Sequence, residues 1–223
     1  MKLWIAGTVP QVIAAARTGI PAAIVTNPTV VADWSTAAQQ PIEEIARHIL
    51  AETDLPLYLQ LRGPDTAGFL REAEHFAQIS PRILPKLPST TEGIAAAADL
   101  ERQGRTTLVT TVCSVSQAYL CAAAGVSAIC PYYARLDQSG EDAAAFLQRV
   151  SALYRAQGAA TQILPASIRS VAQAEAALCA GASGVIVFDD VFRSLCTHPV
   201  TESSLEAFER DWAQTLSTYP HTQ

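Results

Sequence analysis

Short, continuously apolar runs alternate with longer amphipathic segments along most of this chain of 223 residues. A continuous apolar run of about 4–8 residues, bounded by turn residues, is typical of a strand that is buried on both faces. Such strands occur in parallel sheets that are covered by helices. The pattern predicts eight of them, at residues 3–6, 22–26, 57–61, 83–87, 107–111, 127–131, 162–166 and 184–188.

Segments with helical periodicity follow the predicted strands, and several of them end at a glycine such as Gly19, Gly104 or Gly181. Residues 89–92 (Ser-Thr-Thr-Glu) are typical of a capping box at a helix start. Residues 132–137 are predicted to form a loop. Helices are predicted at residues 9–18, 41–52, 65–79, 90–103, 114–124, 142–155, 171–179, 190–196 and 202–217, with some further helix at 31–39.

The order of these elements predicts an α/β fold. Eight strand–helix units in 223 residues favour a (β/α)8 TIM barrel, since such barrels form from about 200–250 residues. An open, doubly wound sheet is the alternative, but no glycine-rich phosphate loop follows the first strand. No linker or short repeat interrupts the pattern, so residues 1–223 are expected to form one domain with a terminal helix.

Composition narrows the class of protein. Hydrophobic residues make up 49% of the chain and charged residues 16%, which is enough for a sizeable core. A net charge of −6 and a pI near 5.2 argue against a nucleic-acid-binding surface. No apolar run reaches transmembrane length, and no signal peptide is evident at the start. We therefore expect a protein that binds neither nucleic acid nor membrane.

The cysteines and histidines predict neither disulfides nor a metal site. The five cysteines are odd in number and have no CxxC spacing, so they are expected to be reduced, buried thiols in a cytoplasmic protein. The four histidines are scattered along the chain, without the spacing of metal ligands. The expectation is an enzyme that uses neither a metal nor another cofactor.

Lys86 is the most unusual polar residue in the pattern. The chain has only two lysines, Lys2 at the N-terminus and Lys86 inside the apolar run at residues 83–87. Burial lowers the pKa of a lysine, and the neutral amine can then attack a carbonyl to form a Schiff base. The alternative is a lysine at a strand end whose ammonium group reaches solvent.

Further polar residues fall where predicted strands end, and in a barrel those ends face one mouth. Tyr132 can donate or accept a proton, directly or through a water held by Gln60 and Thr110. Arg135 and nearby polar groups can bind a phosphate, because guanidinium geometry matches it. The residues assigned to this mouth are Asn27, Gln60, Lys86, Thr110, Tyr132, Arg135, Ser167, Arg169 and Asp190.

Each of these residues also has an ordinary structural explanation. Asn27 precedes a proline and suits a turn. Gln60 can form a structural hydrogen bond, and Tyr132 can be a core residue. Ser167 and Asp190 can cap helices, and the two arginines can be surface charges. The joint placement of these residues with Lys86 favours the functional interpretation.

Several short motifs carry a resemblance to a known family. They are VTNPT at residues 25–29, KLP at 86–88 with TEG at 91–93, QA at 117–118, PY at 131–132 with RLD at 135–137, AS at 166–167 and FERDW at 208–212. With them the chain resembles the small transaldolase family, and within it the fructose-6-phosphate aldolase subgroup. The resemblance extends from the first strand to the terminal helix, and it implies a barrel of the class I aldolase type.

The resemblance also implies a mechanism without a metal or other cofactor. Lys86 would form the Schiff base with a ketose or with dihydroxyacetone. Transaldolases proper usually have glutamate at the position of Gln60 and often phenylalanine at that of Tyr132, so this pair favours the aldolase subgroup. Family members often assemble as rings, commonly decamers or pentamers, in which the helix at residues 201–217 reaches a neighbour. The other implied roles are a donor-hydroxyl contact for Asn27, water and proton handling for Gln60, Thr110 and Tyr132, and phosphate binding for Arg135, Ser167 and Arg169.

One position departs from the family pattern. The family usually has an aspartate at the end of the first strand, where this chain has Ala6. Three hypotheses follow. The chain is an aldolase that releases dihydroxyacetone, or a transaldolase that moves this unit between phosphorylated or sulfonated sugars, or a catalytically impaired barrel that binds sugar phosphates.

Overall fold

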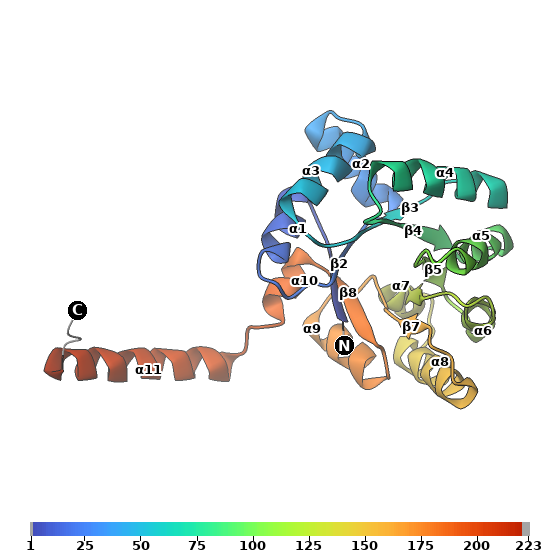
Figure 1. Cartoon of the computed structure of the whole chain (residues 1–223). Helices are drawn as coiled ribbons and strands as arrows, with labels where there is room; N and C mark the ends of the chain where they lie inside the picture. Colours follow the sequence, from blue (N-terminus) through green and yellow to red (C-terminus); the bar gives the residue numbers. More distant parts are fainter. Residues whose placement is uncertain (1, 220–223) are drawn as a thin grey trace.

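The computed structural model of the chain describes residues 2–219. In it one sheet of eight parallel strands curls into a barrel, and helices surround the strands (Figure 1). This confirms the (β/α)8 barrel that the sequence predicts. The strands are β1 (Lys2–Ala6), β2 (Ala23–Val25), β3 (Leu57–Gln60), β4 (Ile83–Pro88), β5 (Leu108–Val112), β6 (Ala128–Pro131), β7 (Gln162–Ile163) and β8 (Gly184–Phe188).

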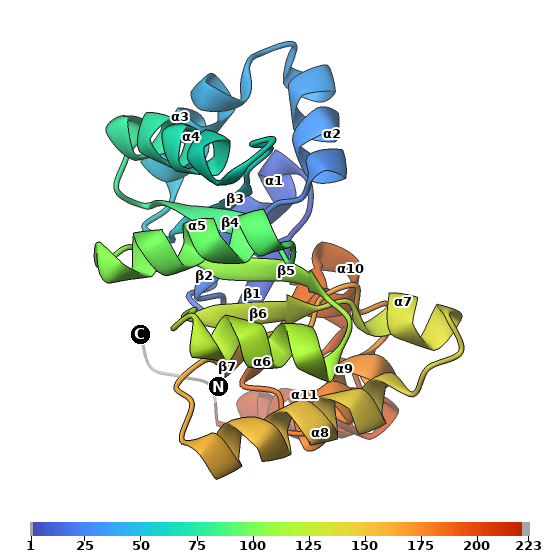
Figure 2. The same cartoon turned by 90° about the vertical axis from the view of Figure 1, so that its right-hand side faces the viewer.

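Helices cover the outer face of the sheet, as the two perpendicular views show (Figures 1 and 2). Several of them begin at a side-chain cap, such as Asp65 before α4 and Ser170 before α9. The helices are α1 (Val9–Ala16), α2 (Pro28–Ala38), α3 (Ile42–Glu52), α4 (Thr66–Ile79), α5 (Thr91–Arg102), α6 (Val115–Ala123), α7 (Tyr133–Gln138), α8 (Ala143–Gln157), α9 (Val171–Cys179), α10 (Asp189–Ser194) and α11 (Pro199–Thr218).

The barrel closes between its last two strands. The continuous ladder runs from β7 through β6 to β1 and ends at β8. Two backbone hydrogen bonds then join β7 to β8, from Ser183 N to the Ile163 oxygen (2.8 Å) and from Ile186 N to the Pro165 oxygen (2.9 Å). Closure matters for function, because it gathers the C-terminal ends of all eight strands around one mouth.

The strands bury both of their faces. Trp4, Tyr58, Leu108 and Ile186 belong to a cluster that fills the barrel, while Ile5 and other alternate residues belong to the larger cluster between strands and helices. Successive side chains of a strand point to opposite faces. The residue two places after each inner residue therefore also faces the barrel interior, one layer nearer the mouth.

Three local predictions are wrong. Residues 132–137 were expected to form a loop, but Tyr133–Gln138 form α7. Thr90 is the N-cap of α5 and accepts a hydrogen bond from Gly93 N, so Glu92 does not complete a capping box. Asp190 does not cap α10, since Phe188 occupies the cap position and Asp190 lies in the first turn.

The terminal helix α11 extends away from the barrel (Figure 1). None of its residues is buried. Several of its large apolar side chains are at least half exposed, among them Phe208 (59%) and Trp212 (56%). The predicted extra C-terminal helix is thus present. None of the helices within residues 2–219 combines the length and the apolar character needed to cross a bilayer.

Candidate active site

A cavity of about 340 Å³ lies at the C-terminal ends of the strands, and Lys86 is one of its lining residues. We call it the active-site cavity. Ala6 from β1 and Phe188 from β8 also line it. The structure brings six of the nine residues assigned to the mouth into its lining, namely Asn27, Lys86, Tyr132, Arg135, Ser167 and Arg169.

Lys86 reaches the cavity because of strand alternation. Leu84 packs against the inner cluster, and Lys86 is two residues further along β4, so its side chain also faces the barrel interior. Lys86 is only 3% exposed. Its Nζ donates a hydrogen bond to the Thr26 carbonyl oxygen at 2.6 Å.

The environment of Lys86 favours its neutral form. Burial lowers the pKa of the amine, and the nearby Cys130 thiol opposes this effect only in part. No carboxylate is among the groups that shift this pKa. An amine without a counter-ion in a buried site loses its proton readily, and the neutral amine is the nucleophile that Schiff-base chemistry requires.

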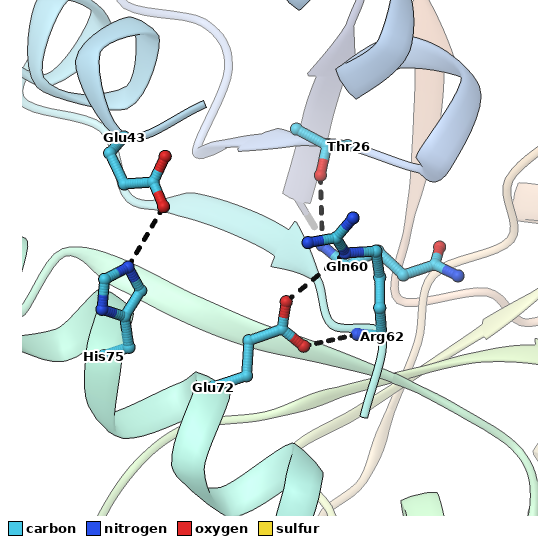
Figure 3. Close-up of polar contacts among 6 residues, drawn as sticks. All are labelled: Thr26, Glu43, Gln60, Arg62, Glu72 and His75. Atoms are coloured by element: carbon cyan, nitrogen blue, oxygen red, sulfur yellow. Dashed lines mark hydrogen bonds and ion pairs between the residues drawn. The ribbon is translucent and has the colours of Figure 1, made fainter. Parts of the chain in front are cut away.

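Thr26 holds this part of the site together, and the sequence analysis did not single it out. Its hydroxyl donates to the Tyr58 oxygen (3.1 Å) and accepts from Gln60 N (3.2 Å), while its carbonyl accepts from Lys86. Figure 3 shows the contact with Gln60. Thr26 is 1% exposed at the end of β2, and the only signal in the sequence is its place beside Asn27.

The loop after β3 is fixed by charged residues that lie outside the cavity. Arg62 N donates to Glu72 Oε2 at 2.6 Å, and Arg62 Nε lies 3.6 Å from Glu72 Oε1. Next to this pair, His75 and Glu43 join α4 to α3 at 3.1 Å (Figure 3). Backbone hydrogen bonding and His75 lower the pKa of the Glu43 carboxyl group. The contacts of Arg62 fix the loop that follows Gln60.

Gln60 and Thr110 do not line the cavity, although both were predicted to belong to the site. They sit on the strands next to Lys86, with Gln60 opposite Lys86 in the β3–β4 register and Thr110 on β5 opposite Pro88. Gln60 Oε1 and Thr110 Oγ1 are both buried without a hydrogen-bond partner within the described residues. Buried polar atoms are usually satisfied by protein or by ordered water, so these two can hold a water molecule.

Tyr132 follows β6 and is the N-cap of α7. Burial is the main effect on its hydroxyl group and raises its pKa. The hydroxyl therefore stays protonated and can donate a proton near Lys86. The guanidinium carbon of Arg135 lies 5.2 Å from the centre of the Tyr132 ring, which is a cation–π contact.

Helix α7 contacts the segment that carries two of the residues predicted to bind an anion. Its first N–H groups bind the chain after β7, with Tyr133 N donating to the Ala166 oxygen (2.9 Å) and Ala134 N to the Ser167 oxygen (3.3 Å). Ser167 has a φ of +60°, a strained conformation for a residue with a side chain. These contacts place Arg135 and Ser167 on the same wall of the cavity.

The wall formed by these residues is cationic. Arg135 and Arg169 both line the cavity, both are exposed, and neither forms an ion pair with another residue of the described chain. Guanidinium groups without carboxylate partners are suited to binding a phosphate or a sulfonate. The residues predicted to bind an anion thus come from two segments, α7 and the chain between β7 and α9.

A second strained residue lies at the end of β5. Thr111 has a φ of +60°, and the β5–β6 register shifts between Thr110 and Val112. Ser89 stabilises this bulge by donating its hydroxyl proton to the Thr111 oxygen at 2.9 Å. Bulges next to active sites redirect side chains, and this one lies directly after Thr110.

Asn27 has a structural role beside its expected functional one. Its Oδ1 accepts a hydrogen bond from Val30 N (2.9 Å) and so caps α2. The amide nitrogen of the side chain remains available to the cavity that Asn27 lines. Ser167, by contrast, is not a helix cap, since Ser170 caps α9.

Several residues that line the cavity are not among those predicted from the sequence. Asp33 from α2 and Phe188 from β8 are two of them, and Ile186 is a third. Asp33 lies two turns beyond Asn27 on a helix that was only loosely predicted, so it carried no signal. The alternation of side chains along β8 predicts that Phe188 faces the barrel interior, because Ile186, two residues earlier, belongs to the inner cluster. No group of three acidic, cysteine or histidine side chains within residues 2–219 is placed to hold a metal.

Similar solved structures share the fold of the chain. Thiamine phosphate pyrophosphorylase from Pyrococcus furiosus superposes with a TM-score of 0.57 at 14% identity, over 84% of this chain and 85% of that one. A flavocytochrome b2 variant with sulfite bound gives a TM-score of 0.58 at 12% identity, over 85% of this chain and 57% of that one. Likeness at such low identity supports the barrel and nothing about chemistry.

Sequence relatives are more informative. A protein of Pelotomaculum thermopropionicum described as a probable transaldolase is 34% identical over 95% of this chain and 97% of its own length. A probable transaldolase of Caulobacter vibrioides is 33% identical over 96% of this chain and 98% of its own. The family model "Transaldolase/Fructose-6-phosphate aldolase" matches residues 12–220. The chain thus belongs to the transaldolase/fructose-6-phosphate aldolase family, and it is an enzyme of the aldolase or transaldolase type.

Proposed function

We propose that the chain is a class I aldolase that cleaves or forms a ketose like fructose 6-phosphate. The products of cleavage are dihydroxyacetone and an aldehyde such as glyceraldehyde 3-phosphate. The observation that carries this proposal is Lys86, a buried amine with a lowered pKa in a cavity that two unpaired arginines also line. Neither a metal nor another cofactor takes part in the proposed reaction.

The cavity residues suit each step of this reaction. The Lys86 amine adds to the ketose carbonyl, and a water molecule leaves as the imine forms. The bond between the third and fourth carbons breaks when the hydroxyl proton of the fourth carbon is removed, and its electrons move into the imine to give an enamine. Tyr132, with a water held by Gln60 and Thr110, exchanges the protons of these steps. Protonation of the enamine and hydrolysis of the imine release dihydroxyacetone and restore the amine.

Recognition of the substrate is divided between two walls. Asn27 has a free amide nitrogen after capping α2, and it is assigned to a hydroxyl group of the donor. Arg135, Ser167 and Arg169 are assigned to the anionic group of the acceptor. The sugar is thereby held at both ends while its carbonyl carbon lies at Lys86.

Transaldolase activity is the second candidate, and the names of the relatives favour it. In that reaction the enamine on Lys86 attacks a second sugar aldehyde, phosphorylated or sulfonated, and no free dihydroxyacetone appears. The impaired barrel is a third possibility, because Ala6 supplies no carboxylate. A barrel that only binds a ligand needs neither a neutral buried lysine nor a tyrosine beside it.

Borohydride trapping with dihydroxyacetone or fructose 6-phosphate tests the Schiff base. Hydride reduction of the imine leaves a stable secondary amine, and peptide mass mapping should locate it on Lys86. The chain offers a matched control, since Lys2 is its other lysine and is exposed. Lys2→Arg should retain the adduct and turnover, whereas Lys86→Arg should lose both. A folded protein that binds sugar phosphate but is never trapped would be the impaired barrel.

The two enzymatic candidates differ in their free product. Fructose 6-phosphate is supplied without an acceptor aldehyde, and free dihydroxyacetone is measured. Steady release over many turnovers supports the aldolase. Release of no more than one equivalent, with turnover restored by erythrose 4-phosphate, supports the transaldolase.

We also propose that residues 1–223 form one barrel domain that assembles as a pentamer or decamer through the helix at residues 201–217. Exposed apolar side chains of α11, among them Phe208 and Trp212, form what we call the apolar stripe of this helix. The stripe supports the proposal, because such side chains are rarely left in water on a lone helix. The five cysteines are free thiols, which supports a reducing compartment such as the cytoplasm. The expectation that they are buried is wrong for three of them, since Cys113 is half-buried and Cys179 and Cys196 are exposed.

A further inference from the structure

A smaller, open recess lies beside the active-site cavity. It has a volume of about 260 Å³ and is formed by the chain after β7, the start of α10 and a side chain of α1. Arg169 and Phe188 line both spaces, and Arg169 is the charged residue that they share. We call this space the acidic recess, because Asp189 and Asp190 also line it.

One carboxylate of the acidic recess is buried and only half paired. The side chain of Asp189 is 8% exposed, and its Oδ2 accepts a hydrogen bond from Arg193 Nε at 2.7 Å. Its Oδ1 is buried and has no hydrogen-bond partner within residues 2–219. A buried carboxylate oxygen without a donor costs free energy, so the recess favours a donor that turns towards Asp189.

Asp190 adds a second negative charge at the same place. It is exposed in the first turn of α10, and its carboxylate forms no ion pair in the described part of the chain. The uncharged polar side chain of the recess is Gln11, whose Oε1 accepts from Thr8 N at 2.9 Å, which holds the amide at the start of α1. Among the described residues that line the recess, only Arg169 can bring a positive charge to the carboxylates.

Arg169 has a fixed backbone and a free guanidinium group. The preceding residue, Ile168, is 1% exposed, and Arg169 N donates to Gln173 Oε1 at 2.8 Å. The side chain is exposed, and its guanidinium pairs with no carboxylate of the described chain. Rotation about the side-chain torsions, without movement of the backbone, can therefore turn this group towards the active-site cavity or towards the acidic recess.

We infer that Asp189 and Asp190 compete with the anionic group of the acceptor for the guanidinium of Arg169, and thereby limit the preference of the site for anionic over uncharged acceptors. An anion that uses Arg169 must draw it away from the two carboxylates. The apparent affinity for the anion then falls with the fraction of molecules in which the guanidinium is free. An uncharged acceptor does not use Arg169, so the competition leaves its binding unchanged. The inference rests on the proposed anion-binding role of Arg169 and deepens it.

Methyl phosphate probes the anion site without any need for the Schiff base. Its dissociation constant is measured by calorimetry at low ionic strength, where charge interactions are screened least. Asp190→Asn removes one competing charge at an exposed position, so the fold should persist. We expect methyl phosphate to bind about three- to tenfold more tightly to this variant. Asp189→Asn keeps the shape of the side chain and should act in the same direction.

A double-mutant cycle with Arg169→Ala locates the effect. In the Arg169→Ala background, Asp190→Asn should lose most of its gain, because no guanidinium remains to be released. Asp33→Asn is the control, since Asp33 lies on α2 and lines the active-site cavity but not the acidic recess. It removes an equal charge, and its effect on methyl phosphate should be the same with and without Arg169.

The same competition should appear in turnover. The kcat/KM for glyceraldehyde 3-phosphate is compared with that for uncharged glyceraldehyde, each with dihydroxyacetone as the donor. The ratio should rise about three- to tenfold in Asp190→Asn, and the rise should disappear when Arg169→Ala is added. An unchanged ratio would overturn the assigned role of the carboxylates in acceptor preference.

The outcomes separate this inference from the proposed function. Unchanged binding of methyl phosphate in both Asp190→Asn and Asp189→Asn, with weaker binding in Arg169→Ala, would overturn the inference alone. Equal gains for Asp190→Asn with and without Arg169 would also overturn it, because the effect would then be a general one of charge. Binding that changes in neither Arg135→Ala nor Arg169→Ala would overturn the proposed anion site together with the inference.

Discussion

The Nζ atom of Lys86 lies 2.6 Å from the carbonyl oxygen of Thr26, across the barrel interior from β4 to β2. A carbonyl group accepts a hydrogen bond from an amine but supplies no negative charge. Thr26 therefore fixes the direction of the amine, and its carbonyl stabilises the ammonium form less than a carboxylate would. Thr26 orients the nucleophile, and burial lowers its pKa.

The buried amine should cost stability. Lys86→Met removes the amine and keeps a flexible side chain of similar length. Burial lowers the pKa of Lys86 in the folded chain below its ordinary 10.5. Between these two pKa values the unfolded chain binds more protons, so the free energy of unfolding rises with pH. Each unit of difference between them contributes about 1.4 kcal/mol.

We therefore expect Lys86→Met to be more stable than the original protein at neutral pH and to lack its rise in stability on the alkaline side. Urea unfolding at a series of pH values measures both effects. Lys2→Met, at an exposed lysine, is the control and should change neither. Equal pH profiles for Lys86→Met and the original protein would show that the amine is not desolvated.

Tyr132 should be the main proton donor and acceptor of the site. Tyr132→Phe removes only the hydroxyl group and should lower kcat by about 10²–10⁴-fold, while Lys86 can still be trapped with dihydroxyacetone. Tyr133→Phe is the control, because Tyr133 is buried among the residues that pack between strands and helices. Nearly normal turnover of Tyr132→Phe would assign proton transfer to another group.

The arginine wall should recognise the anionic group of the acceptor. Arg135→Ala should raise KM for a phosphorylated acceptor about 10- to 100-fold, since a charge-assisted hydrogen bond is lost. The KM for an uncharged aldehyde should stay the same. Arg149 is exposed on α8 and does not line the cavity, so Arg149→Ala is the control. A similar loss for both acceptors would mean that Arg135 supports the fold and not the anion.

Two buried threonines near β5 should differ in their effects. Thr110 Oγ1 has no hydrogen-bond partner within the described residues, whereas Thr107 Oγ1 donates to Glu101 Oε1 at 2.6 Å. Thr110→Val should leave the free energy of unfolding unchanged or slightly higher and lower kcat about tenfold or more.

Thr107→Val should show the opposite pattern. We expect a loss of about 1.5–3 kcal/mol in the free energy of unfolding and little change in kcat for the fraction that folds. Denaturant unfolding and steady-state kinetics on both variants test this. A Thr110→Val variant with full activity would contradict the assigned water site.

The apolar stripe of α11 should hold copies of the chain together. Trp212 is 56% exposed, so Trp212→Glu should change the barrel itself very little and weaken the assembly. Gln214→Glu adds a charge to the opposite side of the helix and is the matched control. Sedimentation velocity measures the oligomer, and an unchanged Trp212→Glu assembly would exclude α11 from the interface.

The sequence alone determined the fold and the chemical character of the site. Continuous apolar strands and amphipathic helices are local patterns, and they survive in the structure, with the predicted bounds unchanged at β8 and α9 and shifted by up to three residues at β7 and α11. Lys86 was recognisable as a candidate site residue, because a lysine within an apolar strand is either buried or reaches the mouth of the barrel. These predictions succeed because burial and periodicity act on consecutive residues.

Tertiary structure decided which residues from distant parts of the chain are neighbours in the fold. Helix α7 was not predicted, and its first N–H groups bind oxygens of Ala166 and Ser167, which are more than thirty residues away in the chain. The pairing of Gln60 with Lys86 and the bulge after Thr110 depend on strand register, which the pattern of apolar residues does not fix. Such features depend on the closure of the barrel, because only closure brings residues from distant strands within hydrogen-bonding distance.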